Sequence, residues 1–323
     1  MPVIATQQLT KRYPRVTALD GLSLEVGDGV TGLVGANGAG KSTLIKILLG
    51  LSDPTSGSAQ VLGHDVRDDG AALRSRVGYM PEHDCLPADV SATELVVHLA
   101  RMSGLPTDAA RERAADTLRH VGLYEERYRP IGGYSTGMKQ RVKLAQALVH
   151  DPDVVFLDEP TNGLDPAGRD EMLGLVRRIY DDFGISVLVT SHLLGELERI
   201  CDQVVIVDGG VLLRSSTVAD FTRASAQLAV EVAHDTAGAA AALTAAGLQV
   251  SREGETLLVE LGAGPGADSD AGAVHDTVRD VVADGYGLVR LESRRHHIAE
   301  VFDPTTTGPS GPTSDQGATD DAA

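Results

Sequence analysis

The stretch that decides the fold reads Gly35-Ala36-Asn37-Gly38-Ala39-Gly40-Lys41-Ser42-Thr43. It stands between an apolar run that predicts a strand, Val30–Val34, and a run that predicts a helix, Leu44–Leu49. Glycines let backbone N–H groups approach phosphate oxygens without obstruction from a Cβ atom, and the N-terminus of a following helix adds a partial positive charge. The stretch therefore predicts a cradle for the phosphates of a nucleoside triphosphate.

The fixed positions of this loop have different chemical roles. The pattern G-x-x-x-x-G-K-[ST] places a lysine, here Lys41, at the β- and γ-phosphates and a hydroxyl, here Ser42, on Mg²⁺. Lys41 is therefore also a candidate catalytic residue. The residues expected to contact the nucleotide are Gly35, Asn37, Gly38, Gly40, Lys41, Ser42 and Thr43. A glycine-rich chain meets the fixed positions by chance with a frequency on the order of one in a hundred, and the flanking strand and helix lower it further.

The composition limits the class of protein. The chain has 323 residues, enough for one large domain plus a smaller one. Its formal net charge of −18 opposes binding to nucleic acid or anionic lipid, and no long Lys/Arg run offsets that charge. Two cysteines, Cys85 and Cys201, are too few for a disulfide framework, which indicates a reducing compartment. We expect both to be buried thiols.

No stretch of the sequence predicts a membrane segment. Met1–Tyr13 lacks the charged, apolar and small-residue order of a signal peptide, and no apolar run reaches the length of a membrane span. The run Ala237–Ala246 comes nearest but is short. We therefore expect a cytoplasmic protein whose membrane role, if it has one, depends on a partner.

Two predicted strands end in candidate catalytic residues. Val154–Glu159 is an apolar run that ends in Asp158 and Glu159, and Ile185–Thr190 is followed closely by His192. The carboxyl ends of parallel strands form the edge of a sheet at which ligands bind. Asp158 is expected to hold Mg²⁺ through water, Glu159 to deprotonate the attacking water, and His192 to meet the γ-phosphate. Solvated acids and a structural histidine are the alternatives.

The start of the chain and its middle predict two further parts of this domain. Val3–Leu9 and Leu22–Val26 predict a small sheet around Tyr13, where an aromatic residue is more often packed than stacked on a base. Residues of about 86–150 predict a helical insertion, whose helices are Ser91–Ser103, Ala109–His120 and Lys139–His150. Ser91 opens a capping-box pattern, and Ser135 is placed to cap the third helix.

The pattern of elements changes from about Gln227. Strands are predicted at 228–232, 248–251, 256–261 and 287–291, and helices at 237–246 and 271–284. This β-α-β-β-α-β order is that of a ferredoxin-like α+β domain. It carries no catalytic motif, and the adjacent His296 and His297 are interpreted as surface residues. We expect a nucleotide-binding domain at 1–217, an accessory domain at 226–303 and a disordered tail at 304–323.

Taken together, the motifs of residues 3–217 resemble the ATP-binding subunits of ABC transporters, because they follow in that family's order. The resemblance implies an α/β P-loop NTPase domain with a parallel core sheet, a small antiparallel β lobe and a helical insertion. It makes Gly35–Thr43 the Walker A loop and Val154–Glu159 the Walker B strand, with Glu159 as the catalytic residue. It also implies that Tyr13 stacks on adenine and that His192 is the switch histidine.

Two stretches depart from the family's pattern. Tyr134-Ser135-Thr136-Gly137-Met138 takes the place of the signature LSGGQ and keeps its second and fourth residues. The family implies that Ser135 and Gly137 complete the ATP site of the opposite subunit in a head-to-tail dimer. Glu82 stands where the family has the glutamine that touches Mg²⁺. We expect Glu82 to ligate the metal.

The resemblance also implies a function. The signature peptide and Thr161-Asn162-Gly163-Leu164-Asp165 look most like exporters with separate ATPase and membrane chains, including drug-resistance ATPases. It implies a homodimeric ATPase that uses ATP and Mg²⁺, lies at the inner face of the cell membrane and drives an integral membrane permease, without nucleic acid.

A non-transport ABC ATPase acting on the ribosome or nucleic acid is the alternative. Such proteins usually carry two modules or a long coiled coil, and this acidic chain has one module and no heptads. A regulatory module with little turnover is a third possibility, which the presence of Glu159 and His192 disfavours.

Overall fold

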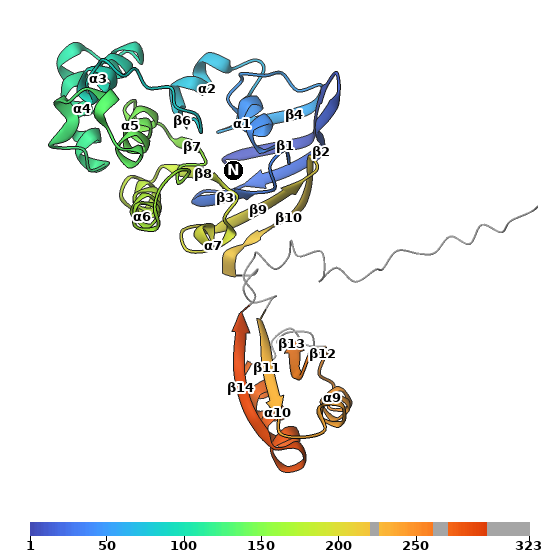
Figure 1. Ribbon diagram of the computed structural model, residues 1–323. Helices are drawn as coiled ribbons and strands as arrows, with labels where there is room; N and C mark the ends of the chain where they lie inside the picture. Colours follow the sequence, from blue (N-terminus) through green and yellow to red (C-terminus); the bar gives the residue numbers. More distant parts are fainter. Residues whose placement is uncertain (220–225, 261–270, 296–323) are drawn as a thin grey trace, which may run out of the picture. The chain divides into compact units, whose positions relative to one another are not determined.

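The computed structural model describes residues 1–219, 226–260 and 271–295. The chain divides into two compact units, residues 1–224 and 225–323, which Figure 1 colours from blue to red along the sequence. His296, His297 and the predicted tail at 304–323 lie outside the described residues.

A six-stranded, mainly parallel sheet forms the centre of the first unit (Figure 1). In spatial order its strands are β10 (Val211–Thr217), β9 (Gln203–Asp208), β3 (Val30–Val34), β8 (Ser186–Ser191), β7 (Val154–Asp158) and β6 (Val77–Met80). Only β10 runs antiparallel to its neighbour. Every residue of β3, β7 and β8 is buried, which explains why these strands are continuous apolar runs in the sequence.

A second, antiparallel sheet forms the predicted β lobe. Its spatial order is β2 (Val16–Val26), β1 (Ile4–Tyr13), β4 (Ser56–Val61) and β5 (His64–Asp65). The hairpin of β1 and β2 is longer than predicted and carries Tyr13 at its tip, where Tyr13 pairs with Val16. Helix α1 (Lys41–Leu48) packs in a core that includes residues of both sheets. Full burial of side chains such as Leu44, Ile45 and Leu48 contributes about 1.5–3 kcal/mol each.

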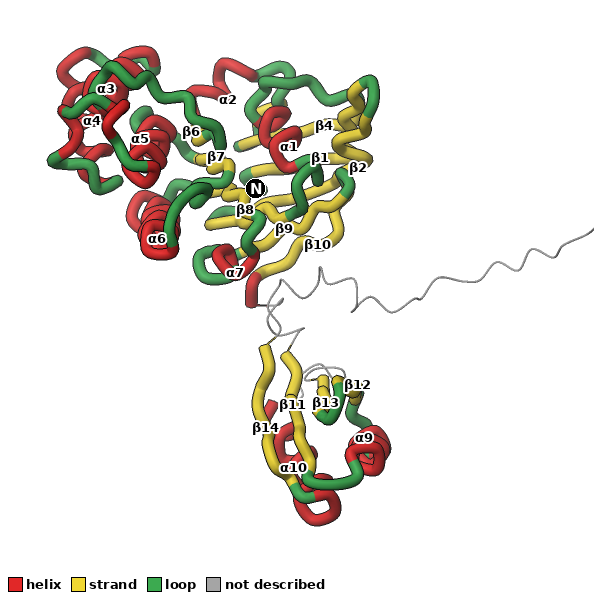
Figure 2. The backbone as a smooth tube through the Cα atoms, in the orientation of Figure 1, coloured by secondary structure: helices red, strands yellow, loops and turns green. Residues whose placement is uncertain are grey.

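Helices α3, α4 and α5 gather at one end of the first unit (Figure 2). Besides α1, the helical elements of this unit within the described residues are α2 (Gly70–Arg76), α3 (Ala92–Met102), α4 (Thr107–His120), η1 (Glu126–Tyr128), η2 (Ile131–Gly133), α5 (Thr136–Leu148), α6 (Pro166–Phe183) and α7 (Leu194–Leu197). The capping box of Ser91 and Glu94 is present. Ser135 caps α5 by accepting a hydrogen bond from the Met138 N–H, so α5 begins at Thr136 rather than at the predicted Lys139.

The second unit has the element order β-α-β-β-α-β. Its elements are β11 (Ala226–Val232), α9 (Thr236–Ala245), β12 (Val250–Glu253), β13 (Thr256–Glu260), α10 (Ala271–Tyr286) and β14 (Leu288–Arg295). The strands form one antiparallel sheet in the order β12-β13-β11-β14. The unit has its own core, in which Leu228, Leu243, Leu257 and Val278 are fully buried.

Two predictions about exposure have different outcomes. Cys201 is buried, but Cys85 is exposed, so the expectation of two buried thiols is wrong for Cys85. Cys85 lies in the loop after β6, where the chain has left the sheet.

Within the described residues, no helix combines the length and apolar character needed to cross a membrane.

Candidate functional site

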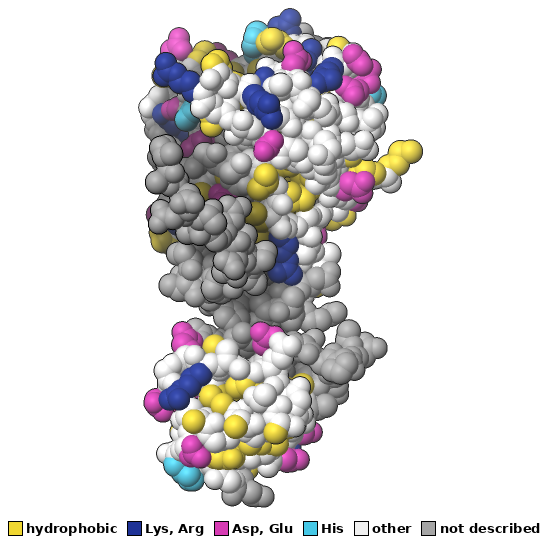
Figure 3. Space-filling model, turned by 90° about the vertical axis from the view of Figure 1, so that its right-hand side faces the viewer, with side chains coloured by type: hydrophobic (Ala, Val, Ile, Leu, Met, Phe, Trp, Pro, Cys, Tyr) yellow, Lys and Arg dark blue, Asp and Glu magenta, His cyan; other side chains and the backbone are white. Residues whose placement is uncertain are grey.

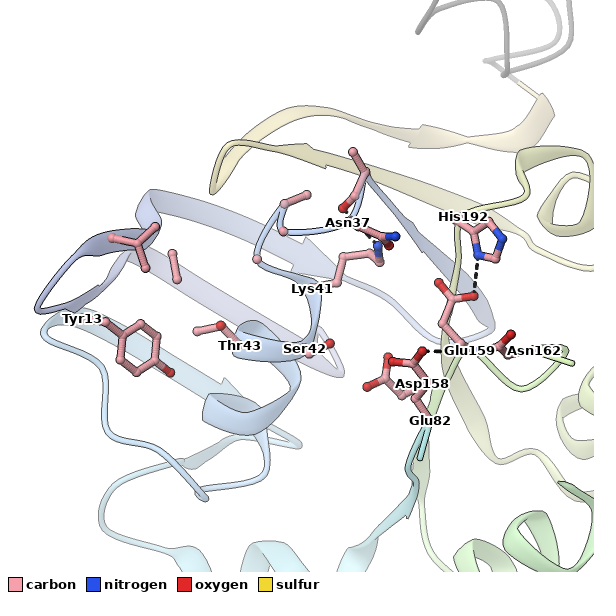
Figure 4. Close-up of a pocket in the computed structure, with 16 residues that line it drawn as sticks. Tyr13, Asn37, Lys41, Ser42, Thr43, Glu82, Asp158, Glu159, Asn162 and His192 are labelled. Atoms are coloured by element: carbon pink, nitrogen blue, oxygen red, sulfur yellow. Dashed lines mark hydrogen bonds and ion pairs between the residues drawn. The ribbon is translucent and has the colours of Figure 1, made fainter. Parts of the chain in front are cut away.

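A pocket of about 530 Å³ lies at the carboxyl ends of β3, β7 and β8 (Figure 4). Of the predicted site residues, it brings together Tyr13, Asn37, Gly38, Gly40, Lys41, Ser42, Thr43, Glu82, Asp158, Glu159 and His192. In Figure 4, Asn37, Lys41 and Ser42 lie between Tyr13 on one side and the pair of Glu159 and His192 on the other. Tyr13 is 41% exposed, so the alternative that it is packed inside the β lobe does not describe it.

Two glycines fix the path of the loop that precedes α1. Gly40 is the N-cap of α1 with φ of 103°, and a Cβ atom there would lie 2.4 Å from the carbonyl oxygen of Ala18. Gly35 does not line the pocket, and a Cβ atom there would lie 2.2 Å from the carbonyl oxygen of Val207. Gly35 therefore serves the close packing of the loop against β9.

Lys41, the first residue of α1, is held against the loop that precedes the helix. Its side chain is largely buried, and Nζ donates to the carbonyl oxygens of Gly35 at 2.7 Å and Ala36 at 3.3 Å. These bonds place a positive charge beside the loop, where it can meet an anionic phosphate.

The two acids at the end of β7 are both buried, with 5% of Asp158 and 7% of Glu159 exposed. Burial raises the pKa of Asp158 above its usual value, although a hydrogen bond from Thr190 opposes that shift. Glu159 has φ of 50°, in the left-handed region that a residue with a side chain rarely adopts. Such a backbone conformation persists only where surrounding contacts hold it.

His192 contacts Glu159 directly. Its Nδ1 atom lies 2.9 Å from Oε2 of Glu159, and the imidazole is about half exposed. The two side chains come from the ends of neighbouring strands, as predicted from the sequence. His192 can therefore fix the position of the Glu159 carboxylate relative to a water in the pocket.

Glu82 follows β6 and also lines the pocket. Its Oε1 atom accepts a hydrogen bond from Nδ2 of Asn162 at 3.3 Å. The nearby Tyr79 has its pKa raised to about 12, chiefly by burial and then by the negative charges of Asp158, Cys85 and Glu82. The carboxylates of Asp158 and Glu82 therefore both lie at this side of the pocket, near Tyr79.

Three residues of the site were missed by the sequence analysis. Asn162 lines the pocket, Thr190 bonds to Asp158 and to the Glu159 backbone, and Lys143 donates to the carbonyl oxygens of Pro81 and Glu82. The signals available were weak. Thr190 is a polar residue that ends an apolar strand, and Lys143 is a charged residue among apolar positions of a helix.

Ser135 and Gly137 lie elsewhere in the first unit. They line a second pocket of about 580 Å³ together with residues 163–165, and this pocket shares no lining residue with the first. The structure therefore does not bring Ser135 and Gly137 to the loop before α1 within one chain.

The donors of the first pocket fit Mg²⁺. Ser42, Asp158 and Glu82 offer a hydroxyl and two carboxylates, the hard oxygen ligands that Mg²⁺ prefers. Among the described residues, no group of three or more His, Cys, Asp or Glu could hold a metal ion by itself. Mg²⁺ is usually held by one or two carboxylates with waters and substrate phosphates, so this donor set suits a metal that arrives with a nucleotide.

Comparison with known proteins connects this geometry to a family. The family model described as "ABC transporter" matches residues 19–162. The chain is 39% identical over 209 residues to the uncharacterized ABC transporter ATP-binding protein YxlF of Bacillus subtilis, covering 64% of this chain and 68% of that protein.

Two further relatives and one solved structure give the same family. The daunorubicin/doxorubicin resistance ATP-binding protein DrrA of Streptomyces peucetius is 38% identical, covering 68% of this chain and 66% of its own length. The Nod factor export ATP-binding protein I of Ralstonia nicotianae is 37% identical, with 65% of each chain covered. The structure of cbiO1 from Clostridium perfringens, part of the ABC transporter complex cbiONQ, superposes with a TM-score of 0.63 at 28% identity. It covers 68% of this chain and 90% of cbiO1. The chain thus spans about two thirds of the length of these sequence relatives.

Proposed function

The chain belongs to the ABC transporter ATP-binding proteins and is an ATPase of that family, and we propose that it hydrolyses ATP to drive export through a separate membrane protein. The observation that carries the proposal is that one pocket is lined by the loop before α1, by Glu159 and by His192. A phosphate cradle, a buried acid and an imidazole bonded to that acid are what hydrolysis of a terminal phosphate requires.

Each side chain has a defined part in this reaction. The loop N–H groups and Lys41 hold the phosphates, and Tyr13 stacks on the adenine at the far side of the pocket. Glu159 accepts a proton from the attacking water, and His192 holds the carboxylate in place. Ser42, Asp158 and Glu82 would hold Mg²⁺, which supplies positive charge that offsets the charge developing on the phosphate oxygens.

The second pocket supports a dimeric arrangement. Ser135 caps α5, a helix of 13 residues, and the N-terminus of such a helix favours an anion. In our proposal, Ser135 and Gly137 of one copy face the γ-phosphate of ATP held by a second copy. Two nucleotides would then be enclosed between two chains.

Export is supported by the relatives. One is described as a drug-resistance ATP-binding protein and another as an export ATP-binding protein. We infer that this chain works with an integral membrane permease at the inner face of the cell membrane. The substrate would pass through that permease.

An ABC ATPase that acts on ribosomes or nucleic acid is not favoured by any of these observations. The net charge is −18, and on the face shown in Figure 3 the Lys and Arg side chains are interspersed with Asp and Glu. Phosphate backbones attract surfaces where basic residues gather.

Reconstitution tests the proposal. The purified chain should hydrolyse ATP, and a membrane protein encoded beside it should change the rate when both are placed in lipid vesicles. Glu159→Gln should lower ATP hydrolysis about 10²- to 10⁴-fold, both with and without the membrane protein. Hydrolysis that responds to ribosomes or nucleic acid, and not to the membrane protein, would support the alternative function instead.

A further inference from the structure

Thr190 makes two hydrogen bonds with one hydroxyl group, and both lead to the acids of the site. Its Oγ1 atom donates to Oδ1 of Asp158 at 2.8 Å and accepts from the backbone N–H of Glu159 at 2.8 Å. A threonine hydroxyl carries one donor and two acceptor sites, so it can make both bonds at once. Thr190 has no exposed surface, so water cannot replace either bond.

We propose that Thr190 is a positioning residue that sets Asp158 and Glu159 relative to each other. Thr190 on β8 lies opposite Asp158 on β7 in the parallel register of the two strands. It does not line the pocket, so it acts through the two acids rather than by touching the nucleotide. The inference rests on the proposed ATP hydrolysis at this pocket.

The backbone of Glu159 shows why such a residue is needed. Strand β7 ends at Asp158, and Glu159 turns into the left-handed region with φ of 50°. Its N–H has left the strand ladder and donates to the Thr190 hydroxyl, while its carbonyl oxygen accepts from the N–H of Asn162 at 3.1 Å. These two bonds hold the turn from which the Glu159 carboxylate reaches His192.

The bond to Asp158 has a complementary effect. A carboxylate at the end of a strand can rotate about its side-chain bonds, and the Thr190 hydroxyl fixes one of its two oxygens. One hydroxyl therefore couples the side chain of the expected metal ligand to the backbone of the expected base. A change at Thr190 should disturb both acids together.

Two substitutions of Thr190 distinguish the effect of its hydroxyl group from the effect of its methyl group. Thr190→Val keeps the β-branched shape in a buried strand beside Val189 but removes both hydrogen bonds. Thr190→Ser keeps the hydroxyl and removes the methyl group. Ser186→Ala is the matched control, because Ser186 is a buried hydroxyl at the other end of β8 that bonds to Asp28 at 2.6 Å.

The experiment measures ATPase kinetics, nucleotide binding and thermal unfolding for the full chain and each variant. Thr190→Val should lower kcat about 10- to 100-fold, the effect expected on losing a hydrogen bond to a charged group. KM for ATP should change much less, and Thr190→Ser should restore most of kcat. Thr190→Val should also need more Mg²⁺ for half-maximal binding of a fluorescent ATP analogue. Ser186→Ala should lower the unfolding temperature without lowering kcat.

Three results would overturn the proposal. One is an unchanged kcat in folded Thr190→Val, and another is a Thr190→Ser variant as slow as Thr190→Val, which would assign the effect to packing of the methyl group. The third is a failure of Thr190→Val, and of a second variant Thr190→Ala made in that case, to fold while Ser186→Ala folds, which would make Thr190 a stability residue. A wild-type chain that hydrolyses no ATP would instead reject the proposed function.

Discussion

The Nδ1 atom of His192 lies 2.9 Å from Oε2 of Glu159, and the two side chains differ sharply in exposure. The imidazole is 53% exposed and the Glu159 side chain 9%. The histidine therefore reaches from the mouth of the pocket to an acid that is almost closed off from solvent. An acid in that position can accept a proton from a water that has entered the pocket.

Replacing this acid should separate binding from chemistry. Glu159→Gln should bind ATP and lose about 10²- to 10⁴-fold in turnover, because an amide cannot take the proton from the attacking water. The variant should accumulate as an ATP-bound dimer. Hydrolysis and ATP-dependent dimerisation should be measured on the same preparation, with Asp170→Asn, an exposed acid of α6 paired with Arg199, as control. Near-normal turnover would remove Glu159 from the role of base.

Glu82→Gln should raise the Mg²⁺ concentration needed for half-maximal hydrolysis, because a neutral amide oxygen is a weaker ligand than a carboxylate. Asp84→Asn is the control, since Asp84 lies in the same loop but bonds to Lys139 and does not line the pocket. A Mg²⁺ titration of ATPase activity tests whether Glu82 ligates the metal. Coincident curves for wild type and Glu82→Gln would reject Glu82 as a ligand.

Removing the second unit should leave the ATP site intact. A chain ended at residue 224 keeps all residues of both pockets, and the two units have separate hydrophobic cores. We expect it to bind ATP but to assemble less well with the membrane partner or with a second copy. Equilibrium nucleotide binding and co-purification measure the two properties. A folded truncated chain without ATP affinity would contradict the prediction.

His150 should make stability depend on pH. Burial lowers the pKa of His150 below its usual 6.5, and Nε2 lies 3.1 Å from the carbonyl oxygen of Val77. As pH falls below 6.5, the unfolded chain takes up a proton before the folded chain does, so the free energy of unfolding falls. The fall ends below the lowered pKa of the folded state.

A glutamine at this position tests the origin of that pH dependence. His150→Gln keeps a donor near Val77 and cannot titrate, so it should flatten the fall in stability that the wild type shows below pH 6.5. Urea unfolding at a series of pH values measures the effect. Parallel profiles for wild type and His150→Gln would assign the pH dependence to other groups.

Local signals predicted much of this fold. Buried parallel strands such as β7 are continuous apolar runs, and the capping box at Ser91 marked the start of α3 within a residue. The start of α5 was less clear, because Thr136 and Gly137 have the composition of a turn, and only the Ser135 cap shows that they are helical.

The parts that were missed depend on contacts between distant segments. Thr190 meets Asp158 across 32 residues of sequence, and Asn162 meets Glu82 across 80. No local pattern encodes such pairs, which arise only when the sheet aligns its strands. Gly35, whose place in the motif predicts a contact with the nucleotide, also packs closely against Val207, and that second role is not visible in the local sequence.

The division of Ser135 and Lys41 between two separate pockets has a kinetic consequence. If the groups that complete one ATP site come from two chains, the specific activity of the free protein should fall on dilution, with a reaction order above one in protein. A membrane partner that holds two copies side by side would replace bulk concentration by a fixed local concentration. ATP would then be hydrolysed mainly where the membrane partner holds two copies together. A chain diffusing alone would bind ATP without hydrolysing it.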